Sequence, residues 1–174
     1  MRNTNESWNN LMGFFRELDN HTQLIRWIDF LDILFGGEYF PEPRWNTSKK
    51  TRFTKIVKQL PRITKENWIV KPQKEINWEL IDRSDIHIVM IKGDAEGKSL
   101  LRHIRNSIAH GNCKIRRLYN EDMLEMMDYR DDGHTIQTAD ILIPLEMIHI
   151  LHQKYNECRR LPNKPPKRSK KHVA

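Results

Sequence analysis

Apolar side chains recur at helical spacing in the first part of the chain. Residues 6–18 and 22–34 show the period of an amphipathic helix, and the glycine pair Gly36 and Gly37 ends the second one. That second helix is apolar over a wide arc, so we expect it to lie in the core or in a dimer interface. A shorter helix is predicted near 48–60, with apolar residues facing inward and lysines facing outward.

Two further helices are predicted in the second half of the chain. One runs from about 95 to 110 and is closed by Gly111, at the position where a left-handed residue commonly ends a helix. The other covers 145–158, and Pro144 suits its first turn because proline has no amide hydrogen to leave unpaired there. Residues 61–84 are poorly periodic and are expected to be mostly loop.

The clearest β signal is a hairpin. Its arms are expected at 124–129 and 135–143, joined by a turn at 131–133. The apolar run 86–91 fits either a strand or a buried helical turn, because periodicity does not separate the two at this length. The pattern predicts a mainly α fold with a small β-hairpin before the last helix, forming one domain over residues 1–158.

Positive charge is concentrated in two segments of a chain whose net charge is +7. Residues 159–174 are rich in proline and hold seven Lys or Arg and no acid, so we expect a basic disordered tail. Residues 44–74 hold ten Lys or Arg against one acid, Glu66, although residues 1–158 as a whole are neutral. Basic segments on an otherwise acidic body indicate a polyanionic partner, and scattered lysines are also typical of a solvated surface.

Several classes of protein are disfavoured by the composition. The two cysteines, Cys113 and Cys158, form no CxxC pair and are expected to be reduced thiols in a cytoplasmic protein. No apolar run is long enough to span a bilayer, so no membrane association is expected. No zinc spacing is present, and the glycine-rich stretch 93–99 is one residue short of a phosphate-binding loop. We therefore expect neither a metal nor a cofactor.

The most distinctive string in the chain reads RNSIAHGN over residues 105–112, at the end of the predicted 95–110 helix. Arg105 offers a planar, permanently charged fork for a phosphate, and a neutral imidazole at His110 can accept or deliver a proton. On a helix these two residues lie about 140° apart, so one helix does not present them side by side. Asn106 and His103 share the face of His110, away from the apolar stripe. A second copy across a two-fold axis would bring both groups into one groove, which favours a dimeric site.

Residues 101–112 closely resemble the signature of the HEPN superfamily, in which catalytic members carry an Arg, a polar residue and, a few residues later, a His. The resemblance implies a helical bundle, a homodimer with a composite site, and a metal-independent endoribonuclease of the toxin or anti-phage defence type. Arg105 and His110 would be catalytic, and Asn106 would orient them. The 2′-hydroxyl of the RNA would attack, giving a 2′,3′-cyclic phosphate, and an antitoxin or inhibitor protein would be a further partner.

The sequence also allows other interpretations of these residues. His110 could simply cap the helix while Arg105 pairs with Glu96 or Asp94, and the domain could be a non-catalytic RNA-binding or assembly module. HEPN toxins that are silenced by adenylylation carry a Tyr two residues after the His, whereas this chain has Asn112 there. The residues expected to bind RNA are basic: Arg102, Lys49, Lys50, Arg52, Lys55, Lys167, Arg168, Lys170 and Lys171.

Overall fold

The computed structural model describes residues 47–93, 95–131 and 133–160. The helices predicted at 6–18 and 22–34 and the tail from residue 161 lie outside this range. The described part is a mixed α/β fold built on a five-stranded sheet, so the prediction of a mainly α bundle is wrong. The hairpin before the last helix is present, but it forms the middle of a larger sheet.

The sheet has the strand order β1-β2-β5-β4-β3. β1 and β2 are parallel, whereas β2–β5, β5–β4 and β4–β3 are antiparallel pairs. The strands are β1 (Trp68–Lys71), β2 (His87–Ile91), β3 (Cys113–Leu118), β4 (Glu121–Tyr129) and β5 (Gln137–Pro144).

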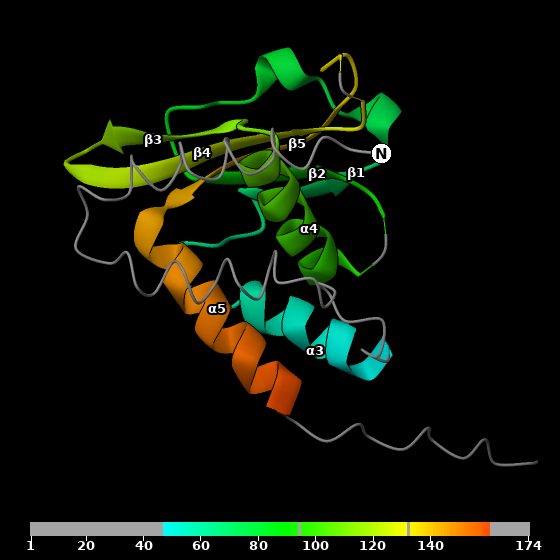
Figure 1. Ribbon diagram of the computed structural model, residues 1–174, viewed down its shortest axis with the longest axis vertical. Coiled ribbons are helices and arrows are strands. Elements are labelled where there is room, and N and C mark those ends of the chain that lie inside the picture. The colour runs from blue at the N-terminus through cyan, green and yellow to red at the C-terminus, as the bar shows by residue number, and fades with distance from the viewer. Residues whose placement is uncertain (1–46, 94, 132, 161–174) are drawn as a thin grey trace, which may run out of the picture.

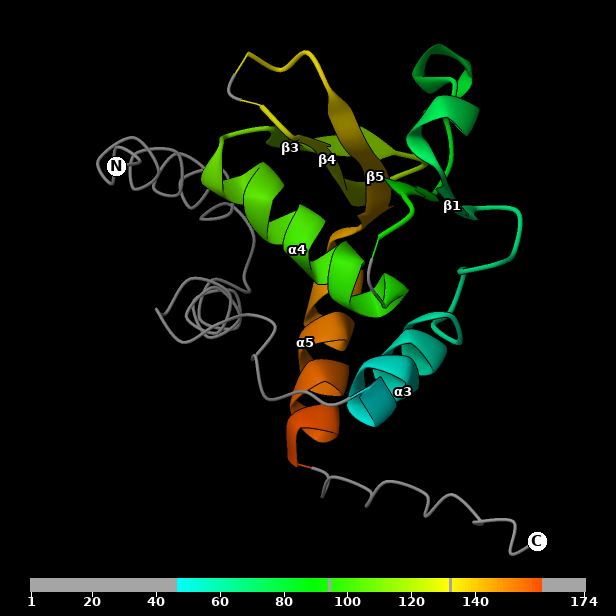
Figure 2. The ribbon, with the colours of Figure 1, turned by 90° about the vertical axis from the view of Figure 1, so that its right-hand side faces the viewer.

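The three described α-helices lie on one side of this sheet. They are α3 (Thr47–Val57), α4 (Glu96–Ala109) and α5 (Leu145–Arg160). Figures 1 and 2 show α4 next to the sheet and α3 and α5 farther from it, while the segment between β1 and β2 lies on the opposite side. Two 3-10 helices, η1 (Gln73–Glu75) and η2 (Trp78–Leu80), belong to that segment.

The core fills the space between the sheet and α4, where the apolar stripe of the helix packs on the apolar face of the strands. α4 buries the stripe expected from its sequence, and every second residue of the central strands faces it. Between the two helices that lie farther from the sheet, Phe53 of α3 and Tyr155 of α5 pack edge to face with their ring centroids 6.3 Å apart. The side chains buried between α4 and the sheet are Leu100, Leu101, Ile104, Ile108, Ile88, Met90, Leu124, Met126, Ile141 and Ile143.

The β-structure that the sequence pattern missed has identifiable causes. The run at 86–91 is strand β2 and not a helical turn, and its neighbours on both sides complete its hydrogen bonding. β1 lies inside the stretch 61–84 that was expected to be loop, because four residues are too few to establish a period. β3 is a strand that the pattern did not predict, because the consecutive residues Arg116 and Arg117 interrupt its alternation of apolar and basic residues.

Glycines at both ends of α4 have structural roles. Gly111 has a φ of 70°, its amide donates to Ile108 O at 3.1 Å, and the next amide donates to Ser107 O at 2.8 Å, which confirms the predicted helix closure. Gly97 lies against α3, where a Cβ would come within 2.9 Å of Phe53 Cδ1 and 3.0 Å of the Thr54 backbone. The need for close helix packing therefore accounts for this glycine of the phosphate-loop-like stretch.

Candidate active site

The last turns of α4 carry the arginine and asparagine of the RNSIAHGN string. Both side chains are half-buried. Arg105 Nη1 donates a hydrogen bond to Asn106 Oδ1 at 3.0 Å, and Asn106 Nδ2 donates to Asp128 Oδ2 at 3.4 Å. The structure therefore links two of the three predicted catalytic residues and connects them to a strand of the sheet.

The carboxylate that receives Asn106 is almost fully buried. Asp128 is 3% exposed and lies near the end of β4, where a bulge shifts the β4–β5 register. Its side chain faces α4. Its Oδ2 also accepts from His103 Nδ1 at 2.6 Å and from Thr138 Oγ1 at 3.0 Å. Sequence reasoning missed Asp128. The available signal was a carboxylate in a strand flanked by apolar residues, which needs hydrogen-bond partners if it is buried.

His103 was expected on the face of α4 that points away from the apolar stripe. Its side chain is only 2% exposed, because β4 covers this face of the helix and supplies the partner of His103 Nδ1. Its Nε2 is buried and has no hydrogen-bond partner among the residues that the structure describes. This face of α4 therefore packs against β4 at His103, and α4 is held to the sheet by polar contacts as well as by its apolar stripe.

His110 is the residue that caps the C-terminus of α4. Its amide donates to Asn106 O at 3.0 Å, and its side chain is half-buried. Nearby, Asn112 Nδ2 lies 3.4 Å from His134 Nε2 of the β4–β5 loop. The ring of His134 stacks on that of Tyr129, with centroids 4.7 Å apart. A second imidazole and an aromatic ring therefore lie close to the end of the helix.

Glu96, one alternative partner of Arg105, is far from it along α4. Glu96 lies at the opposite end of α4, where its Oε2 accepts from Trp68 Nε1 at 2.8 Å and pairs with Lys58 Nζ at 2.5 Å. This carboxylate is therefore bound by other elements of the fold. Asp94 lies outside the described residues.

The basic residues predicted to bind RNA are distributed over two helices. Arg102 is exposed on α4, one turn before Asn106. On α3, Arg52 and Lys55 are exposed while Lys49 and Lys50 are half-buried. α3 contacts α4 at Gly97, which lies roughly 12 Å from Arg105 and roughly 20 Å from His110 along the axis of α4. Lys167, Arg168, Lys170 and Lys171 lie outside the described residues.

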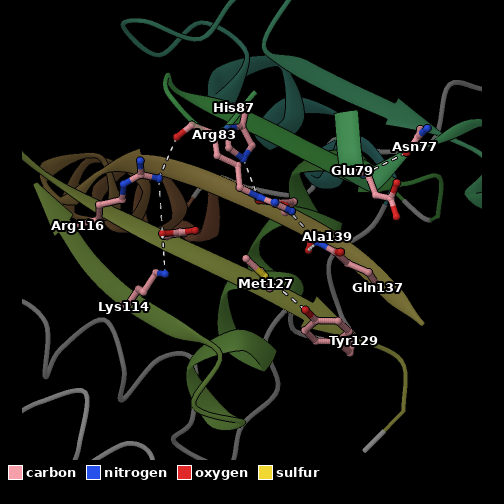
Figure 3. Close-up of polar contacts among 12 residues, drawn as sticks. Asn77, Glu79, Arg83, His87, Lys114, Arg116, Met127, Tyr129, Gln137 and Ala139 are labelled. Atoms are coloured by element: carbon pink, nitrogen blue, oxygen red, sulfur yellow. Dashed lines mark hydrogen bonds and ion pairs between the residues drawn. The ribbon is translucent and has the colours of Figure 1, made fainter. Parts of the chain in front are cut away.

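A second polar cluster occupies the opposite face of the sheet (Figure 3). Asp140 is fully buried on β5, where its Oδ2 lies 2.7 Å from Arg83 Nη2 and its Oδ1 lies 2.9 Å from His87 Nε2. Burial alone would raise the pKa of the Asp140 carboxyl, but the hydrogen bonds from His87 and Arg83, with their charges, hold it below the usual value. The hydrogen bond to Asp140 in turn raises the pKa of Arg83.

Glu125, on the same face, lies 3.3 Å from Lys114 Nζ and 3.9 Å from Arg116 Nη1. Arg116 also donates to the backbone oxygen of Arg83 at 3.0 Å, which joins the segment before β2 to β3. The register pairs Asp128 with Ala139 and Met127 with Asp140, so the Asp128 and Asp140 side chains point to opposite faces of the sheet. This cluster is therefore separate from the α4 site.

A comparison with known families identifies the domain family of the chain. The sequence profile described as HEPN pEK499 p136 matches residues 2–160. The chain belongs to this HEPN family. No curated protein and no solved structure matches the chain. Membership indicates a ribonuclease or nucleotide-related function at the level of the family.

No helix in the described residues is both long and apolar enough to cross a membrane. In the same ranges, no group of three or more His, Cys, Asp or Glu side chains is arranged to hold a metal ion.

Proposed function

We propose that this HEPN protein is a metal-independent endoribonuclease of the toxin or anti-phage defence type. The observation that carries the proposal is the contact between Arg105 and Asn106 at the end of α4, within a string that resembles the catalytic signature of the HEPN superfamily. Buried hydrogen bonding behind Asn106 limits the freedom of this pair. A phosphate-binding group that is held in place before the substrate arrives loses less conformational entropy on binding.

The three side chains have complementary roles in this reaction. His110 takes the proton from the ribose 2′-hydroxyl or delivers one to the leaving 5′-oxygen. Arg105 stabilises the negative charge that develops on the phosphate, and Asn106 directs its guanidinium. Because the attacking oxygen belongs to the substrate, the products are a 2′,3′-cyclic phosphate and a 5′-hydroxyl, and DNA is inert.

A homodimer completes the site. Arg105 and His110 are separated by about 140° around α4, and a partner chain related by two-fold symmetry supplies the group that one helix does not direct to the same phosphate. Arg102 and the exposed residues Arg52 and Lys55 of α3 add attraction for the RNA backbone that does not depend on sequence. The basic residues of 161–174 contribute to the same attraction.

The test is incubation of total RNA with the wild type and with His110→Ala and Arg105→Ala in EDTA, followed by analysis of the new RNA ends. We expect cyclic phosphate ends with the wild type and at least about a hundredfold slower cleavage with either variant. Arg117→Ala is the matched control, because this arginine is exposed on β3, and it should cleave as the wild type does. Melting temperatures should be similar for all four proteins, and His110→Ala and Arg117→Ala should bind RNA as the wild type does.

The second candidate function is a non-catalytic RNA-binding or assembly module. The exposed basic residues of α3 and α4 support this function equally well, because attraction to phosphates does not require a catalytic histidine. Intact RNA with the wild type, both in EDTA and with added divalent metal, together with retained RNA binding would favour the module over the enzyme.

A further inference from the structure

The side-chain amide of Asn106 has two ends with opposite hydrogen-bonding character, and only one orientation serves Arg105. Its Oδ1 accepts from Arg105 Nη1, while its Nδ2 donates to Asp128 Oδ2. Rotating the amide by half a turn would aim its oxygen at the carboxylate and its NH2 group at the guanidinium. Both contacts would then be lost, since neither pair would combine a donor with an acceptor.

Asp128 is suited to select this orientation. A carboxylate only accepts hydrogen bonds, so the end of Asn106 that faces it must be the NH2 group. The position of Asp128 Oδ2 is itself determined by two further donors, His103 Nδ1 at 2.6 Å and Thr138 Oγ1 at 3.0 Å. These donors come from α4 and β5, and both side chains are at least nine-tenths buried. Asp128 Oδ2 therefore accepts three hydrogen bonds, from Asn106, His103 and Thr138.

We propose that Asp128 is a positioning residue for catalysis, acting on Arg105 through Asn106. The inference rests on the proposed ribonuclease function and extends it to a residue outside the RNSIAHGN string. Asp128 does not touch the substrate. It holds the amide of Asn106 in the orientation that presents an oxygen to the guanidinium, and so it favours the Arg105 conformer that meets the phosphate.

The experiment is a double-mutant cycle on RNA cleavage with Asp128→Ala and Asn106→Ala. We expect Asp128→Ala to lower kcat by about 10- to 100-fold with KM for RNA changed less than about threefold, because orientation of a bound group is lost. In the Asn106→Ala background, Asp128→Ala should have no further effect on kcat, since the two residues act in series. A loss of folding stability would instead reduce the amount of active protein in either background.

Asp140→Ala is the matched control, because it removes a buried carboxylate from the adjacent strand on the other face of the sheet. It should lower the melting temperature and leave kcat per folded molecule unchanged. If Asp128→Ala does not fold, Asp128→Asn retains the volume of the side chain but offers Asn106 a donor as well as an acceptor. It should lower kcat severalfold, and this effect too should vanish in the Asn106→Ala background.

Wild-type kcat in Asp128→Ala or Asp128→Asn would overturn the inference, and so would effects of Asp128 and Asn106 that multiply. The failure of the proposed function gives a different result. If the wild type cleaves no RNA, or if His110→Ala cleaves as well as the wild type, the proposed function and this inference fall together. If cleavage requires Arg105 and His110 but is indifferent to Asp128, only the inference falls.

Discussion

Two buried carboxylates on neighbouring strands, Asp128 and Asp140, point to opposite faces of the sheet. Asp128 accepts hydrogen bonds from side chains of α4 and β5, and Asp140 accepts them from Arg83 and His87 on the other face. Burying either group without partners would be costly, because a desolvated carboxylate needs hydrogen bonds or opposite charge. These pairings explain how two acidic residues are accommodated inside a small sheet.

At the same scale, the Asp140 contacts predict how stability depends on pH. Burial works against its charged form, but His87 and Arg83 outweigh burial, so the pKa of Asp140 is lower in the folded chain than its ordinary value of 3.8. A depressed carboxyl pKa stabilises the folded state above the unfolded pKa, and this contribution is lost as pH falls through the folded pKa. Asp140→Asn should therefore cost about 1–3 kcal/mol near neutral pH and progressively less below about pH 3.8.

Urea unfolding of wild type and Asp140→Asn at neutral pH and at about pH 3 measures this difference. Ser84→Ala is a suitable control, because its hydroxyl contacts Asp82 at the surface and its effect on stability should be small. A difference between wild type and Asp140→Asn that stays constant over this range would contradict the electrostatic account.

At the scale of elements, α4 connects the sheet, α3 and the candidate site. Its apolar stripe packs on the sheet, its first turn contacts α3, and its last turns carry Arg105 and Asn106. The stripe and the closing Gly111 were predictable, because both depend on local sequence spacing. The contact of its polar face with Asp128 was not predictable, because Asp128 lies 22 residues away from Asn106 in the sequence.

The packing of α3 on α4 predicts an unusual response at Gly97. Replacing a glycine inside a helix by alanine normally stabilises the helix by roughly 1 kcal/mol. Here the new Cβ would lie 2.9 Å from Phe53 Cδ1 and 3.0 Å from backbone atoms of Thr54, so the helices must move apart. We expect Gly97→Ala to destabilise the protein by about 1–3 kcal/mol, measured by thermal or urea unfolding.

Gly93→Ala provides the comparison for this prediction. A Cβ at Gly93 would meet Ser99 Oγ at 3.4 Å, which is an ordinary contact, so its effect should be close to neutral. A Gly97→Ala protein that is more stable than the wild type would show that α3 does not pack closely on α4.

At the scale of the whole molecule, the proposed dimer predicts complementation between inactive chains. Arg105→Ala and His110→Ala should each be inactive alone. If each site takes its arginine from one chain and its histidine from the other, half of the randomly mixed dimers hold both variants, and each of these has one intact site. Co-refolding equal amounts should then restore about one quarter of wild-type RNA cleavage.

The control is the double variant Arg105→Ala/His110→Ala mixed with either single variant, which should restore nothing. Absence of recovery in the main mixture, with dimers present by light scattering, would mean that both groups come from the same chain. Recovery of cleavage in the control would mean that one of the two residues is dispensable.

The sequence alone determined the features that depend on neighbours along the chain. These are the periods of the described helices, the hairpin of β4 and β5, the closure of α4 at Gly111, and the RNSIAHGN string that links the chain to the HEPN superfamily. Each of these depends on spacing within about a dozen residues, because the local backbone geometry of a helix or strand determines which residues share a face.

Only the tertiary structure decided that the hairpin belongs to a five-stranded mixed sheet, and that α4 lies against it by a polar face as well as an apolar one. Short strands such as β1 acquire their stability from partners distant in sequence, so their own residues carry little signal. The role of Asp128 was not predictable from the sequence for the same reason, because the hydrogen-bond donors around a buried carboxylate come together only on folding.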